Sequence, residues 1–283
     1  MRGLLTTILL VAFFITPLSA KELTGTLQEI QKTGKIKIGY RQSQPPMSFL
    51  DKDGTPIGYS IDLCEHIVTE VKNTIGSDVA IKYVPVTAAE RFNALSDGKI
   101  DLLCGATTKT LSRGELVDFT QLTFVTGASF MALKGTKIRN NFAGKKLGVV
   151  KGTTTAVALN KLLQDAQIEA DVVLLKSSAK AIKALEKKEI DAFSADQIVL
   201  IGLAITSDNP KNFTILPDLF SYEPFALAVR RNDADFRLVA DRVISDLYRS
   251  RKILKIYDKW LGGFAKNRSS AFEALVTLNA IPE

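Results

Sequence analysis

Hydroxyl and charged side chains follow a predicted strand in the first half of this chain. The apolar run at 100–104 predicts a buried strand. The segment 105–108, which contains Ala106 and Thr108, follows it, and Arg113 lies five residues after Thr108. A guanidinium beyond the carboxyl end of a strand can hold a carboxylate through two parallel hydrogen bonds, and small residues leave backbone N–H groups and hydroxyls open to a ligand. A surface arginine after a core strand fits the same residues, and from this segment alone that interpretation is favoured.

A second anion site is predicted where a glycine and two threonines open a helix. Gly152, Thr153 and Thr154 follow a predicted strand at 144–150. Free N–H groups at the start of a helix, together with threonine hydroxyls, can bind an anion. The alternative is a simple capped turn without a ligand.

A carboxylate follows another predicted strand. Asp196 lies just past the strand predicted at 190–194 and directly before the helix predicted at 197–205. Its side chain can pair with the ammonium group of a ligand, cap the helix, or do both.

Two further arginines are expected beside strand ends. Arg41 ends the strand predicted at 35–41. The residues 87–90, Thr-Ala-Ala-Glu, form a predicted capping box, which places Arg91 in the first turn of the next helix. By themselves, both arginines are better explained as surface residues than as ligand-binding residues.

The sequence around Thr108 and Arg113 resembles a known family. A strand, a small polar turn, T-x-x-x-x-R and the V-D-F-T of residues 117–120 are similar to the bacterial extracellular solute-binding proteins for polar amino acids, which are the periplasmic receptors of ABC importers. The resemblance extends from about Gly34 to about Gly262 and includes the run P-P-M-S-F-L-D…G-x-P-I-G-Y-S-I-D-L.

This resemblance implies a role for the candidate residues. It implies that Thr108 and Arg113 hold the α-carboxylate of an amino-acid ligand. It also implies that the segment 152–154 contacts the carboxylate end of the ligand from a second lobe, and that Asp196 binds the amine.

The glutamate/aspartate-binding branch of the family is the most similar one. That branch has arginines at places matching Arg41 and Arg91, within G-Y-R and A-E-R-F. Two cations there suit a ligand with a second carboxylate. Ser178 stands where the branch often has a histidine, and we include it in the expected side-chain pocket.

The order of predicted elements indicates the α/β class. The strand-helix pattern occurs twice, with extended segments at 124–133 and 223–230 that cross between the repeats. We therefore expect a two-lobed, type II periplasmic-binding-protein fold with two hinge crossings and the ligand in the interlobe cleft. The expected limits, listed in chain order, are a signal peptide at 1–20, lobe 1 at 21–126 and 226–262, lobe 2 at 127–225, and a C-terminal extension at 263–283 with a helix at 269–279.

The two cysteines leave two possibilities open. Cys64 lies on the apolar face of a helix for which Ser60 is the predicted N-cap, and Cys104 ends a strand. Export permits a disulfide, and two separately buried thiols fit equally well. Their spacing gives no metal signal, and His66 is expected at the surface. We expect no metal and no cofactor.

Composition and the amino terminus indicate an exported soluble protein. Of 283 residues, 37 are Lys or Arg and 30 are Asp or Glu, scattered along the chain without a nucleic-acid motif, so we expect a solvated basic surface. A positive start, an apolar core at 4–15 and small residues before position 21 predict a secretory signal peptide cleaved near Ala20, with an uncleaved anchor as the alternative. The expected product is periplasmic and monomeric, with an amino acid and ABC permease subunits as partners and no nucleic acid.

Two other classes of function compete with a binding protein. Some relatives with this fold are dehydratases that act on carboxylate-rich cyclic acids and need a carboxyl general acid over the substrate. Glu223 is the candidate for that role. A sensor input domain is the third possibility, disfavoured because the sequence shows neither a signalling module nor a later apolar span.

Overall fold

The computed structural model describes residues 22–139, 142–263 and 268–283, so the signal peptide predicted at 1–20 lies outside the described residues. The helices of this part are α1 (Gly25–Thr33), α2 (Tyr59–Ile75), α3 (Arg91–Ser96), α4 (Thr154–Asp165), α5 (Ser178–Glu186), α6 (Gln197–Ile205), α7 (Ala234–Arg249), α8 (Lys252–Leu261) and α9 (Ser270–Leu278), with the short 3₁₀ turns η1 (Arg113–Glu115) and η2 (Pro210–Asn212). The strands are β1 (Lys35–Tyr40), β2 (Ser43–Gln44), β3 (Ser48–Leu50), β4 (Pro56–Ile57), β5 (Ala80–Pro85), β6 (Leu102–Cys104), β7 (Val117–Thr126), β8 (Ala128–Leu133), β9 (Lys146–Val150), β10 (Asp171–Leu175), β11 (Ala192–Asp196), β12 (Phe213–Ile215) and β13 (Glu223–Arg230).

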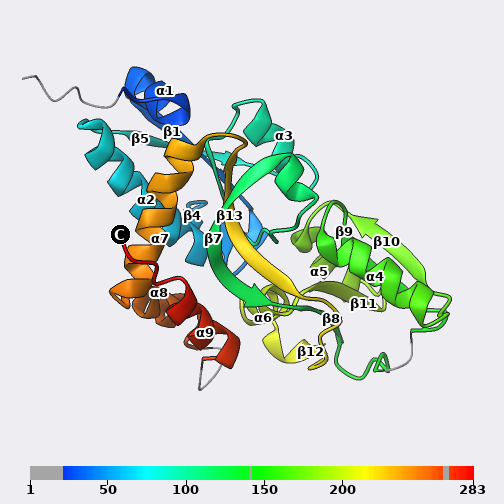
Figure 1. The fold of residues 1–283 in the computed structure, drawn as a ribbon. Coiled ribbons are helices and arrows are strands. Elements are labelled where there is room, and N and C mark those ends of the chain that lie inside the picture. Colours follow the sequence, from blue (N-terminus) through cyan, green and yellow to red (C-terminus); the bar gives the residue numbers. More distant parts are fainter. Residues whose placement is uncertain (1–21, 140–141, 264–267) are drawn as a thin grey trace, which may run out of the picture.

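Two five-stranded sheets form the centres of two lobes (Figure 1). The first has the order β5-β1-β6-β13-β7, in which β1 is parallel to β5 and β6 while β13 is antiparallel to its neighbours. Because β1 and β6 are parallel neighbours, their carboxyl ends meet at one edge. Arg41 and the segment after Cys104 therefore lie close together.

The second sheet repeats this arrangement. Its order is β10-β9-β11-β8-β12, with β9 parallel to β10 and β11 and with β8 antiparallel to its neighbours. The shared edge of β9 and β11 brings the start of α4 next to Asp196. A buried cluster that includes Leu147, Val149 and Leu159 packs α4 onto this sheet.

Two strands carry the chain between the sheets. Strand β7 of the first sheet continues through Gly127 into β8 of the second. The chain returns in β13, whose first residue Glu223 pairs with Thr126 of β7. Figure 1 shows β7 and β13 side by side between the lobes, so both predicted crossings are present.

Helix α2 begins earlier than the sequence indicates. Its N-cap is Gly58, and the Ser60 hydroxyl instead donates to the Gly105 carbonyl at 3.3 Å, so the predicted N-cap role of Ser60 is wrong. The φ of Gly58 is 137°, a backbone conformation that glycine adopts readily because it has no Cβ. This conformation lets the chain enter the helix at Tyr59. The buried face expected from Cys64 and its neighbours is confirmed.

The capping box at residues 87–90 is also wrong in detail. The Thr87 hydroxyl donates to the Glu90 carboxylate at 2.7 Å rather than accepting from a backbone N–H group. Helix α3 begins only at Arg91, with Glu90 as its N-cap, so the predicted place of Arg91 in the first turn of the helix is confirmed. The backbone N–H of Arg91 bonds the Thr87 carbonyl.

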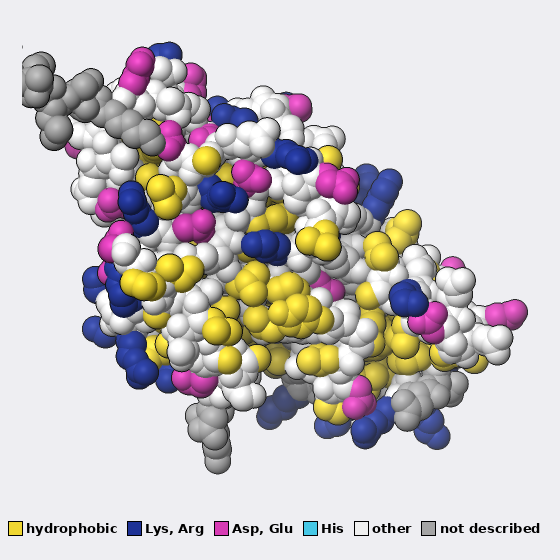
Figure 2. All heavy atoms as spheres, viewed as in Figure 1, with side chains coloured by type: hydrophobic (Ala, Val, Ile, Leu, Met, Phe, Trp, Pro, Cys, Tyr) yellow, Lys and Arg dark blue, Asp and Glu magenta, His cyan; other side chains and the backbone are white. Residues whose placement is uncertain are grey.

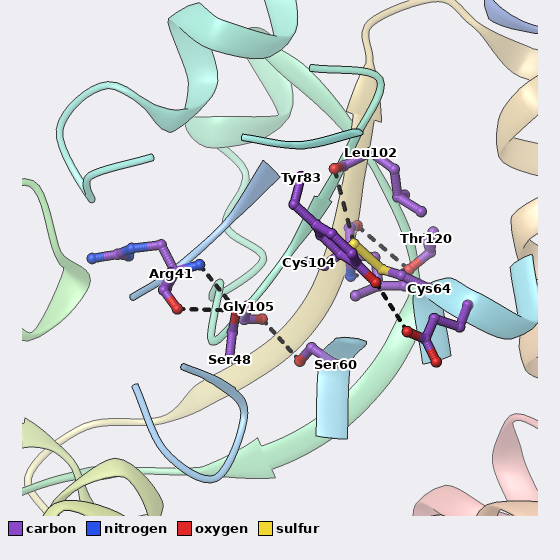
Figure 3. Close-up of a disulfide and its surroundings, with 11 residues drawn as sticks. Arg41, Ser48, Ser60, Cys64, Tyr83, Leu102, Cys104, Gly105 and Thr120 are labelled. Carbon is purple, nitrogen blue, oxygen red and sulfur yellow. Dashed lines mark hydrogen bonds between the residues drawn. A yellow bond between two sulfur atoms is a disulfide. The ribbon is translucent and has the colours of Figure 1, made fainter. Parts of the chain in front are cut away.

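The two cysteines form a disulfide. Cys64 of α2 and Cys104 of β6 are bonded, and both are fully buried (Figure 3). Because Cys104 directly precedes the segment 105–108, the bond anchors that segment to α2. His66, two residues after Cys64, is exposed, as expected.

The carboxyl-terminal end packs on the first lobe. The helix predicted at 269–279 is present as α9, with Ser269 as its N-cap. The ring centroid of Phe272 lies 4.3 Å from that of Tyr257 and 6.0 Å from that of Phe124, so α9 covers β7 and α8. Around these elements, Figure 2 shows basic and acidic side chains interspersed, with apolar side chains gathered near the middle of this face.

Candidate functional site

Arg41 lies at the carboxyl end of β1 and is buried. The Ser48 hydroxyl holds its backbone, accepting from the Arg41 N–H at 2.9 Å. Its side chain points away from the disulfide and out of the first sheet (Figure 3). Burial lowers the pKa of Arg41 to about 10, with the charge of Asp196 acting in the opposite direction.

Arg91 is the most deeply buried cation of the site, with 2% of its surface exposed. Its Nη1 donates to the Ala88 carbonyl and, at 3.4 Å, to the Gly152 carbonyl, while its Nε has no partner among the described residues. Burial, followed by the charges of Arg113 and Arg41, lowers the pKa of Arg91 well below its usual value. A buried guanidinium with a free N–H group is suited to a second carboxylate.

Arg113 begins the 3₁₀ turn η1 and is partly buried. It donates through Nη1 to the Thr108 carbonyl at 2.8 Å and through Nη2 to the Gly152 carbonyl at 3.5 Å. Burial lowers its pKa, and the carboxyl groups of Glu223 and Asp196 oppose that shift. The guanidinium groups of Arg91 and Arg113 lie 4.5 and 5.3 Å from the Phe92 ring centroid, so one ring supports both cations.

Gly152 is the point where the second lobe meets the arginines. A Cβ at this position would lie 2.9 Å from the Ala89 Cα, and its φ is +81°, which only glycine adopts readily. The carbonyl of Gly152 can therefore approach α3 closely and accept from Arg91 and Arg113.

Asp196 is the last residue of β11, not a residue beyond the strand as predicted. It stands at the N-cap of α6 without making a side-chain capping bond, and its Oδ1 has no hydrogen-bond partner in the described part of the chain. Burial, followed by the charge of Glu223, raises the pKa of Asp196 to about 8, while Arg113 and Arg91 act to lower it. One oxygen of this buried carboxyl group therefore lacks a hydrogen-bond partner among the described residues, and the charges of Arg113, Arg91 and Arg41 act on the group.

The remaining predicted residues have different surroundings. Ala106 is buried in the turn after β6, and Ser178 is buried at the first position of α5, where Ser177 is the N-cap. Thr153 is the N-cap of α4, with its hydroxyl accepting from the Ala156 N–H at 3.2 Å and donating to the Val150 carbonyl at 2.7 Å. Its hydroxyl thus serves the helix itself.

The sequence indicated Glu223 only as the candidate general acid of an alternative function, and it did not predict that Glu223 accepts hydrogen bonds within this cluster. Its carboxylate is buried and accepts from the hydroxyls of Thr108, Thr154 and Ser221. Gln44, also buried, has no partner for its Oε1 among the described residues. Neither residue carries a local motif. The pairing of β13 with β7 places Glu223 in the site, and the fold of the loop after β1 places Gln44 there.

Within the described residues, the site has no group of three or more His, Cys, Asp or Glu side chains placed to hold a metal. Three guanidinium groups interact with two carboxyl groups in this cluster, so cationic side chains outnumber acidic ones there. The described residues include no helix that is long and apolar enough to span a membrane.

The two sheets and the site between them are the arrangement of a two-lobed solute-binding protein. Residues 36–263 match the bacterial extracellular solute-binding proteins, family 3, and the chain belongs to this family. It is 33% identical over 262 residues to the L-glutamate/L-aspartate-binding protein of Pseudomonas aeruginosa, covering 91% of this chain and 87% of that protein.

Solved structures agree with the fold. The cysteine-binding protein of Campylobacter jejuni matches with a TM-score of 0.75 and 26% identity, covering 88% of this chain and 98% of that chain. An ancestral amino acid-binding protein, a precursor of cyclohexadienyl dehydratase, matches with a TM-score of 0.72 and 26% identity, covering 83% of this chain and 99% of that chain. The predicted type II periplasmic-binding-protein fold is confirmed.

Proposed function

We propose that the protein captures glutamate or aspartate between its lobes and delivers it to an ABC transporter. The observation that carries this proposal is the buried carboxyl of Asp196, one oxygen of which has no hydrogen-bond partner among the described residues, in the field of Arg41, Arg91 and Arg113. An α-ammonium group would pair with the Asp196 carboxylate, and two carboxylates would neutralise the arginines. Similarity to the Pseudomonas protein supports the same ligand class.

The roles of the site follow from this arrangement. Arg113, Thr108 and the segment 152–154 would hold the α-carboxylate end of the ligand, and Arg41 and Arg91 would hold its second carboxylate. Ser178 and Ala106 would line the pocket. Closure would move lobe 1, assigned to 21–126 and 226–262, against lobe 2, assigned to 127–225.

Cellular context belongs to the same proposal. The chain would be exported by the signal peptide at 1–20, act as a monomer in the periplasm, and dock on permease subunits in the inner membrane. We also propose that it is not an enzyme. Both oxygens of Glu223 accept hydroxyl hydrogen bonds, which is not the arrangement of a general acid held over a substrate.

Calorimetric titration of the mature protein with amino acids tests which ligand it binds. We expect tighter binding of glutamate or aspartate than of glutamine or asparagine, because a neutral amide leaves a buried arginine uncompensated. Tighter binding of glutamine, lysine or arginine would contradict the proposal.

Replacing Arg91 with methionine should reduce the selectivity while leaving amino-acid binding in place. We expect the preference for glutamate over glutamine to fall about tenfold, equivalent to about 1.4 kcal/mol, because one charged contact to the second carboxylate is lost. Titrations with both ligands measure the ratio, and Arg139→Met, at an exposed position, is the control. If the ratio of glutamate to glutamine affinity is unchanged, Arg91 does not contribute to the selectivity, and Arg41 alone would account for it.

The raised pKa of Asp196 predicts pH-dependent affinity. In the free protein this carboxyl is protonated below a pH of about 8, whereas a bound ammonium favours the charged form and lowers its pKa. Binding therefore releases a proton, and affinity for glutamate should rise with pH up to about 8, by at most about tenfold per unit. Calorimetry in buffers of different ionisation enthalpy measures the released proton.

Asp196→Asn provides the control for this effect. The variant should bind glutamate more weakly, lose the pH dependence below 8, and keep its affinity for glutarate, which has no amine. Equal losses for glutamate and glutarate would remove the amine-binding role.

A further inference from the structure

A single buried carboxylate connects the two lobes at the candidate site. Glu223 is 1% exposed, and its Oε2 accepts from the Oγ1 atoms of Thr108 and Thr154, each at 2.6 Å. Its Oε1 accepts from the Ser221 hydroxyl at 2.7 Å. Thr108 follows β6 of the first sheet and Thr154 begins α4 beside the second, so this carboxylate joins groups from both lobes.

These contacts determine the direction of the hydroxyl protons. A threonine hydroxyl has one proton to donate and two lone pairs to accept with. With both protons directed to Glu223 Oε2, Thr108 and Thr154 present only lone pairs to a ligand. Their Oγ1 atoms also lie 3.1 Å apart, so either hydroxyl could donate to the other. A charged carboxylate is the stronger acceptor, which directs both protons to Glu223 and leaves two adjacent acceptor oxygens.

Adjacent acceptors next to acidic groups suit a cation. Burial and the charge of Glu223 both act on Asp196, so the two carboxyl groups are neighbours. An ammonium group beside them would donate to threonine oxygens and to Asp196 and would relieve the repulsion between the acids. Arg113 lies on the other side of Thr108, hydrogen-bonded to its carbonyl, where an α-carboxylate would be held.

We propose that Glu223 is a positioning residue for amine recognition, which acts by keeping the hydroxyls of Thr108 and Thr154 as acceptors for the ligand's α-ammonium group. This deepens the proposed function and rests on it. It refines the roles given above: the hydroxyls of Thr108 and Thr154 bind the amine, and Arg113 holds the α-carboxylate.

The test compares L-glutamate with glutarate, its analogue without the amine. Glu223→Gln keeps the side-chain shape and removes the charge. We expect at least a tenfold loss of affinity for L-glutamate, with glutarate bound equally or more tightly. Glu186→Gln, an exposed change of the same charge in α5, should leave both affinities unchanged.

A purely structural role predicts a different result. If Glu223 only holds the fold together, Glu223→Gln should lower both affinities by the same factor or neither, and either outcome would overturn the inference. Where glutarate binding is too weak to measure, L-glutamate affinity within twofold of the unmodified protein would overturn it.

Thr154→Val keeps the test decisive if the Glu223 variant does not fold. Valine preserves the shape of threonine and removes one acceptor, so it should weaken L-glutamate selectively and spare glutarate. Equal weakening of both ligands would count against amine recognition. Failure of the unmodified protein to bind any amino acid would instead refute the proposed function, which separates the two claims.

Discussion

Arg113→Ala should abolish measurable binding of every amino-acid ligand. Its guanidinium is already placed by the Thr108 carbonyl at 2.8 Å and lies above Phe92, so little reorganisation is needed to hold an α-carboxylate. Removing one partner of a desolvated charge pair typically costs roughly 2–5 kcal/mol, which corresponds to at least about a thirtyfold loss of affinity. Calorimetric titration with glutamate and aspartate measures the loss.

Two variants separate the binding role of Arg113 from a general effect of charge. Arg113→Lys keeps the charge but lacks the fork that bonds a carboxylate twice, so it should recover only part of the affinity. Arg139→Ala removes an exposed arginine whose contact with Asp218 is 3.7 Å long, and it should bind normally. A folded Arg113→Ala protein with near-normal affinity would refute the site assignment.

Removing the disulfide between Cys64 and Cys104 should lower the free energy of unfolding more than any of the other proposed substitutions. The bond closes a loop of 40 residues between α2 and β6. Chain-entropy arguments then give roughly 4 kcal/mol of stabilisation, because the unfolded chain is constrained. Chemical denaturation of the Cys64→Ala/Cys104→Ala protein, compared with the oxidised protein, measures this difference.

A reducing agent provides the matched control for the disulfide. It should destabilise the unmodified protein by a similar amount and leave the cysteine-free variant unchanged. A loss below about 1 kcal/mol in the variant would show that the loop is held by its packing. Since Cys104 precedes the segment 105–108, weaker ligand binding should accompany the lost stability.

The sequence by itself determined the class of the fold and the order of its elements. Alternating apolar residues in β1, the apolar run of β6 and the helical spacing around Cys64 depend on contacts near in the chain, so their patterns are readable. The same local patterns place Arg41 and Asp196 at strand ends, and the resemblance to the family rests on motifs such as T-x-x-x-x-R. The extra helix α9 was readable from its Ser269 cap and its spacing.

Local signals were less reliable where a side chain has two possible partners. Ser60 has a residue type that favours an N-cap, yet Gly58 makes the turn and Ser60 bonds the Gly105 carbonyl across the lobe. Thr87 bonds the Glu90 side chain instead of a backbone N–H group. In both cases a contact formed by tertiary packing replaced the local one.

Only the tertiary structure decided how the site is assembled. Residues far apart in the chain decide between a disulfide and two thiols, and they leave one oxygen of the buried Asp196 carboxyl without a partner among the described residues. They also place Glu223 between Thr108 and Thr154. Sheet order and the pairing of β13 with β7 bring these groups together. Such pairing cannot be read from the linear sequence. The burial of a group and the direction of its hydrogen bonds depend on residues that become its neighbours only when the chain folds.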